Sequence, residues 1–94
     1  MARVLVVDDD PIHLRVYHSK LTSEGFAVEM ASDGAAALMA IATKAPDLVL
    51  LDLMLPGLSG IEVIKTVRTR ERGGRLPIMV LSNLYLESES AAAT

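Results

Sequence analysis

The stretch from Arg3 to Pro11, RVLVVDDDP, decides the fold. Its apolar run lacks the polar alternation of a half-exposed strand, so it predicts a strand that is covered on both faces, as in a parallel sheet. The run ends at consecutive aspartates. Asp10 can cap a helix and Pro11 suits the first helical position, so a helix should follow at once. The stretch therefore predicts a buried strand, an acidic turn and a helix.

The same alternation continues along the chain. We expect further strands over residues 26–31, 47–52 and 77–81, with helices that stop at Gly25, before Pro46 and near residue 71, and a fourth helix from Leu84 onward. The residues expected to face inward are Ile12, Val16 or Tyr17, and Leu21 in the first helix, Leu38, Ile41, Ala42 and Ala45 in the second, and Ile61, Ile64 and Val67 in the third. This order implies right-handed crossovers and one α/β domain with helices on both faces of a parallel sheet.

Composition excludes several classes of protein. The 94 residues carry a net charge of −3, which argues against the nucleic-acid backbone as the main partner. The absence of cysteine excludes a disulfide framework and a thiolate metal site. No apolar stretch approaches the roughly 20 residues that span a bilayer. We expect a cytoplasmic domain that binds neither membranes nor nucleic acid directly.

Polar side chains stand at the ends of three predicted strands. The first strand ends at Asp8, Asp9 and Asp10, the third at Asp52 and the fourth at Ser82. In open parallel sheets, ligands bind beyond the carboxyl ends of the strands. Converging carboxylates repel one another and need a cation or a proton, and Mg²⁺ prefers such oxygen ligands. A carboxylate can also attack phosphorus to give an acyl phosphate. A site for a divalent cation and a phosphoryl group is expected here.

Three segments in order carry a family resemblance: VVDDDP at residues 6–11, DLMLPGLSG at 52–60 and PIMVLS at 77–82. Together they resemble the receiver domain of two-component response regulators. The resemblance implies a flavodoxin-like, doubly wound parallel sheet with strand order 2-1-3-4. The family's fifth strand and fifth helix are expected to be missing from this chain, residues 1–94 being a single, C-terminally incomplete receiver domain.

The resemblance also implies a role for individual residues. Asp52 is the phosphoacceptor, and a sensor histidine kinase or a phosphotransfer protein is the donor. Mg²⁺ is held by Asp9 directly, by Asp8 through water, by Asp52 and by the backbone carbonyl of Met54. The remaining implied roles are the switch hydroxyl for Ser82, loop shape for Pro56 and Gly60, and control of access to the acceptor for Asn83. The module is a signalling phosphoacceptor and not an enzyme, catalysing at most its own phosphorylation and dephosphorylation.

The chain departs from the family at one functional position. The family's lysine follows the fifth strand, and Lys20, Lys44 and Lys65 all map onto helices, so none replaces it. Without the positive charge of that lysine, activation should be impaired even where Mg²⁺ still binds. In the implied strand order, residues 77–81 form an apolar edge strand with unpaired backbone groups. We therefore expect that the chain either belongs to a longer protein or pairs with a second copy of itself.

Two other functions compete with the receiver. One is a phosphohydrolase of the haloacid-dehalogenase type that uses Asp8 as nucleophile and Asp10 as its partner. The other is a self-associating structural domain without phosphotransfer. His13 and His18 suggest a metal site, but residues five apart on a helix point about 140° apart, so we expect no metal role for this pair.

Overall fold

The computed structural model describes residues 1–70 and 76–81. Its elements follow in the order β1 (Arg3–Val7), α1 (Pro11–Ser23), β2 (Ala27–Ala31), α2 (Gly34–Lys44), β3 (Leu48–Asp52), α3 (Gly60–Arg70) and β4 (Ile78–Leu81). Each lies within a residue or two of its predicted range. The predicted helix from Leu84 onward, Ser82 and Asn83 lie outside the described residues. Among the described helices, none is long and apolar enough to cross a bilayer.

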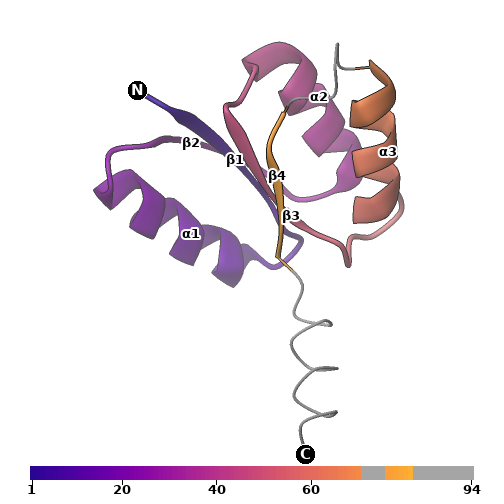
Figure 1. Ribbon diagram of the computed structural model, residues 1–94. Coiled ribbons are helices and arrows are strands. Elements are labelled where there is room, and N and C mark those ends of the chain that lie inside the picture. Colours follow the sequence, from indigo (N-terminus) through magenta and orange to yellow (C-terminus); the bar gives the residue numbers. More distant parts are fainter. Residues whose placement is uncertain (71–75, 82–94) are drawn as a thin grey trace, which may run out of the picture.

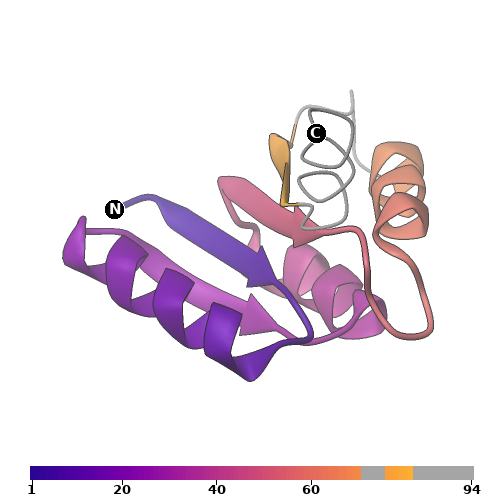
Figure 2. The same ribbon diagram turned by 90° about the horizontal axis from the view of Figure 1, so that it is seen from below.

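The four strands form one parallel sheet in the order β2-β1-β3-β4, which confirms the predicted order. Helix α1 covers one face of this sheet, and α2 and α3 cover the other (Figures 1 and 2). Because all pairings are parallel, the carboxyl ends of the strands point toward the same edge, at the lower part of Figure 1. That edge is where the candidate site lies.

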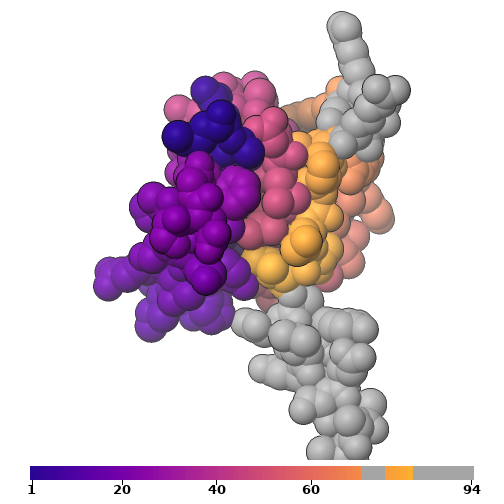
Figure 3. Space-filling model, turned by 60° about the vertical axis from the view of Figure 1, so that its left-hand side comes forward, coloured from indigo at the N-terminus to yellow at the C-terminus, as the bar shows by residue number. Residues whose placement is uncertain are grey.

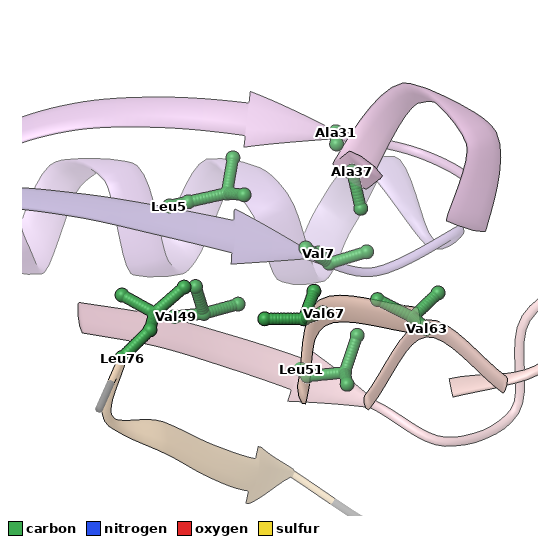
Figure 4. Close-up of a cluster of buried hydrophobic side chains, with 9 residues drawn as sticks. All are labelled: Leu5, Val7, Ala31, Ala37, Val49, Leu51, Val63, Val67 and Leu76. Atoms are coloured by element: carbon green, nitrogen blue, oxygen red, sulfur yellow. The ribbon is translucent and has the colours of Figure 1, made fainter. Parts of the chain in front are cut away.

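Alternate residues of β1 and β3 pack into two separate cores. Leu5, Val7, Val49 and Leu51 face α2 and α3 in a cluster completed by Ala31, Ala37, Val63, Val67 and Leu76 (Figure 4). The intervening residues Val4, Val6 and Leu50 face α1 and pack on Leu14, Tyr17 and Leu21. A strand with a core on each side needs apolar residues at successive positions, which explains the unbroken apolar runs in the sequence.

Capping side chains start two of the helices. The Asp10 carboxylate accepts a hydrogen bond from the Ile12 N–H at 2.9 Å, as predicted. The Asp33 carboxylate accepts one from the Ala36 N–H at 2.7 Å. These caps fix where the chain turns after β1 and β2, and so fix the geometry around the strand ends.

The predicted inward faces of the helices are partly wrong. Ile12 is 70% exposed, and Val16 and Ile61 are also exposed. Ala42 and Ala45 are exposed as well, whereas Ala37 and Val63, which were not among the predicted residues, are fully buried. The sequence offers apolar residues on more than one side of these helices. Only the packing of each helix on the sheet selects the side that is buried, and the period alone does not give it.

Candidate phosphoacceptor site

Three carboxylates meet at the carboxyl edge of the sheet. Asp8 and Asp9 follow β1, and Asp52 is the last residue of the neighbouring strand β3. One oxygen of each lies within 4.8 Å of the other two. Asp9 is exposed, while Asp8 and Asp52 are only 3% and 6% exposed. The structure therefore brings together three of the residues that the sequence places at strand ends.

Backbone hydrogen bonds hold the two buried carboxylates. The Asp8 Oδ1 atom accepts from the Asp10 N–H at 2.9 Å, and the Asp8 N–H donates to the Ala31 carbonyl at 3.1 Å. The Asp52 Oδ1 atom accepts from the Met54 N–H at 2.9 Å. Each carboxylate is thus oriented by the turn that follows its own strand, and the β1–β3 pairing sets the spacing between them.

Burial and charge act in the same direction on Asp52. Loss of solvent raises the pKa of its carboxyl above the ordinary value, and the negative charges of Asp8 and Asp9 raise this pKa further. The Met54 N–H and the nearby His13 oppose the rise. An ionised Asp52 is therefore a charge that the surrounding residues tolerate poorly without a cation.

The residues at this edge fit a divalent cation. Three carboxylates within a few ångströms offer the hard oxygen ligands that Mg²⁺ prefers, and Mg²⁺ sites commonly use one or two carboxylates together with phosphate oxygens. Two of the three are buried, where uncompensated negative charge is costly. The acidity of the cluster and its position in the fold both suit a bound cation.

The loop after β3 brings the start of α3 close to the end of that strand. Gly57 has a φ of +71°, a conformation that favours glycine. A side-chain Cβ on Gly60, the first residue of α3, would lie 2.6 Å from the Leu53 Cα atom and 2.7 Å from the Asp52 carbonyl oxygen. Glycine at position 60 therefore allows α3 to begin directly against the end of β3. Pro56 is exposed in the same loop.

His13 is a site residue that the sequence reasoning missed. Its Nδ1 atom lies 3.0 Å from Asp8 Oδ2, and its Nε2 atom lies 3.5 Å from Asp10 Oδ2. The hydrogen bond and charge of Asp8, with the charges of Asp10 and Asp52, raise the pKa of His13 against an opposing effect of burial. The sequence suggests a pairing of His13 with His18, whereas the contact that His13 makes is with Asp8. The spacing from Asp10 to His13 predicts only the contact between those two side chains, since residues three apart on a helix are neighbours, and it gives no sign of the contact with Asp8.

The remaining predicted site residues have different outcomes. Ser82 and Asn83 are outside the described part of the chain, so their roles stay predictions. The Met54 N–H donates a hydrogen bond to Asp52, and the role of the Met54 carbonyl as a Mg²⁺ ligand also stays a prediction. The Asp10 carboxylate caps α1 and is not one of the three clustered carboxylates. The Asp10 carboxylate is therefore engaged at the start of α1.

Comparison with known proteins places this chain in a family. The profile of the response regulator receiver domain matches residues 4–93. The response regulator MprA of Mycobacterium sp. (strain KMS) is 43% identical over 90 residues, which cover 96% of this chain and 38% of that protein. The DNA-binding response regulator MtrA of Mycolicibacterium smegmatis is 45% identical over 80 residues, or 85% of this chain and 34% of that protein. The chain spans less than two fifths of the length of these relatives.

Solved structures agree with this assignment. The receiver domain of the sensor histidine kinase PA1611 of Pseudomonas aeruginosa, described with a magnesium ion coordinated in the active site cleft, superposes with a TM-score of 0.85 at 30% identity, covering 96% of this chain and 74% of that one. The chemotaxis response regulator CheY4 of Vibrio cholerae gives a TM-score of 0.83 at 29% identity, covering 99% and 79%. With its flavodoxin-like sheet and its acidic strand ends, this chain belongs to the response regulator receiver domain family.

Proposed function

We propose that this chain is a phosphoacceptor module of a two-component system, which receives a phosphoryl group on Asp52 in a Mg²⁺-dependent reaction. The observation that carries the proposal is the position of Asp52, nearly buried at the end of β3 and within reach of two further carboxylates. The proposed donor is a phosphohistidine of a sensor histidine kinase or of a phosphotransfer protein. The proposed location is the cytoplasm, where such donors act.

The chemistry follows from the carboxylate of Asp52. Its free oxygen forms a bond to phosphorus while the P–N bond of the phosphohistidine breaks and the electron pair stays on the imidazole nitrogen. The Met54 N–H holds the other oxygen and fixes the direction of attack. Burial keeps water away from the reacting oxygen.

The proposed Mg²⁺ ligands are Asp8, Asp9, Asp52 and the backbone carbonyl of Met54. When bound, the ion would offset charge on the transferring phosphoryl group. Ser82 is the proposed switch hydroxyl and Asn83 the proposed access residue. Self-phosphorylation and dephosphorylation are the only reactions that we expect the chain to catalyse, and direct nucleic-acid or membrane binding is not expected of it.

Labelling with a small phosphodonor tests the acceptor. We expect acetyl phosphate and Mg²⁺ to add one phosphoryl group to the chain, measured by intact mass, and peptide mapping after borohydride reduction to place it at Asp52. Asp52→Asn should abolish the label, and the capping variant Asp10→Asn is the matched control that should keep it.

The alternatives predict different labelling results. A label on Asp8 that survives Asp52→Asn would support the phosphohydrolase and would overturn the receiver mechanism. No label on the wild-type chain would support the structural, self-associating domain.

We also propose a homodimer through the edge of β4. Among the described strands β4 pairs only with β3, and Met79 and Val80 are exposed on it. The space-filling view shows β4, in orange-yellow, at the surface beside β3 (Figure 3). An apolar edge with free backbone groups is a template for pairing with another chain.

A further inference from the structure

The first turn of α1 places an imidazole beside the acidic site. His13 is partly exposed, yet its Nδ1 atom lies 3.0 Å from Oδ2 of Asp8, whose side chain is 4% exposed. The contact joins residues five apart in sequence, from the strand end to the helix. The cap by Asp10 fixes the start of α1 and therefore fixes where His13 lies relative to Asp8.

Both oxygens of Asp8 are held by this arrangement. Oδ1 accepts from the Asp10 N–H at 2.9 Å and Oδ2 is bonded to His13. A carboxylate has about four acceptor positions, so each oxygen keeps one for a cation or for a cation-bound water. Among the described residues, His13 alone hydrogen-bonds Oδ2, so without it the carboxylate would be held only through Oδ1 and could rotate about that bond.

We infer that His13 is a positioning residue for the divalent cation, and that its Nδ1–H group holds the Asp8 carboxylate in the orientation that the cation needs. The inference rests on the proposed Mg²⁺ site. Groups that hydrogen-bond to metal ligands orient them, and their loss typically costs 10- to 100-fold in metal affinity. His13 acts from outside the cluster, since the group of ligand atoms within 4.8 Å of one another is made by Asp8, Asp9 and Asp52.

A pair of substitutions of similar shape separates hydrogen bonding from packing. Asn places an N–H donor as many bonds from the backbone as His13 Nδ1, whereas Leu has nearly the same shape and no donor. Mg²⁺ affinity is measured by titration calorimetry without any phosphodonor, at a pH well above the raised pKa of His13, so that the ring is neutral. His13→Leu should weaken binding by about 10-fold and His13→Asn by less than about 3-fold. His18→Leu, on the exposed side of the same helix, should bind as the wild type does.

The ring tautomer gives a second readout that does not depend on the cation. Long-range ¹H–¹⁵N spectra of the neutral ring should show the proton of His13 on Nδ1, and Asp8→Asn should shift the Nδ1 signal while the His18 signal stays in place.

Three results would overturn the inference: His13→Leu binds Mg²⁺ as tightly as the wild type or more tightly, His13→Asn is as weak as His13→Leu, or the proton of His13 lies on Nε2. These results leave the label on Asp52 untouched, so they differ from failure of the acceptor assignment. A wild-type chain that takes no Mg²⁺ would remove the proposed cation site and this inference together.

Discussion

Burial and the charges of Asp8 and Asp9 raise the pKa of Asp52, and the sign of the resulting stability effect follows directly. Between the ordinary carboxyl pKa of 3.8 and the raised folded value, the folded chain holds a proton that the unfolded chain has lost. Stability from this group is therefore complete at low pH and is lost as the pH rises through the folded pKa. At neutral pH the ionised carboxylate destabilises the cation-free fold.

Asp52→Asn should consequently stabilise the chain at neutral pH in the presence of a chelator. We expect a gain on the order of 1 kcal/mol in the free energy of unfolding, which should disappear as the pH falls below about 4. Urea unfolding at several pH values measures it. Glu29→Gln, an exposed position on β2, is the control and should change little. A loss of stability in Asp52→Asn at neutral pH would contradict the electrostatic account.

The sequence was sufficient to find the acidic residues but not their hydrogen-bond partners. Asp8, Asp9 and Asp52 could be predicted because each follows an unbroken apolar run, and parallel strands bring such ends together. His13 could not be predicted from a comparison of the two histidines. Its partner Asp8 lies before the helix, and only the placement of α1 on the sheet brings the two side chains together.

At the scale of elements, Gly34 allows α2 to pack closely against the loop that follows β3. A Cβ on Gly34 would lie 2.6 Å from the Leu58 carbonyl oxygen and 2.9 Å from the Leu58 Cβ atom. The same Cβ would lie 3.0 Å from the Cγ2 atom of Val63 in α3. The β2–α2 turn and the loop after β3 can therefore approach closely only because residue 34 has no side chain.

Gly34→Ala should destabilise the fold by about 1–3 kcal/mol, the usual range for overpacking a close contact. Helix propensity alone favours Ala over Gly by about 1 kcal/mol, so the expected effect has the opposite sign to the intrinsic one. Thermal unfolding measures the change. Ala35→Gly, at the exposed neighbouring position, is the control that measures the effect of helix propensity alone in the same turn. A Gly34→Ala variant that melts higher than the wild type would show that the loop can move aside.

The elements were predicted better than their faces. Strand runs and caps gave the element boundaries, because they are local signals. In α1, however, apolar residues stand at 12, 14, 16, 17 and 21, and they form more than one possible stripe. The stripe of Leu14, Tyr17 and Leu21 packs on the sheet, and Ile12 and Val16 lie outside it. Tertiary docking, not periodicity, makes that choice.

At the scale of the whole molecule, the edge of β4 is the surface that we propose for pairing with a second copy of the chain. Met79 is 56% exposed on this strand. A lysine on an edge strand opposes pairing by charge repulsion, so Met79→Lys should weaken the proposed homodimer by about tenfold, or ~1.4 kcal/mol.

Light scattering over a concentration series measures this change. Met39→Lys, at a 67% exposed position on α2, is the control and should leave association as it is. A wild-type chain that stays monomeric throughout the series would defeat the dimer proposal.

The strand order was predictable only through the family resemblance. Alternating strands and helices imply a parallel sheet with right-handed crossovers, but several strand orders satisfy that pattern. The order β2-β1-β3-β4 requires the chain to reverse its direction of winding after β2. That reversal is encoded in which helix packs on which face, which again is a property of the assembled molecule.

The pairing of β1 with β3 has a consequence for folding during synthesis of the chain. These strands pair side by side although α1, β2 and α2 separate them in sequence, so their pairing closes a long loop. During synthesis, the pairing of β1 with β2 becomes possible first. A growing polypeptide that has emerged only as far as α2 carries two of the acids without the third. During synthesis, the mutual repulsion of the three acids can therefore arise only after β3 has emerged and paired with β1.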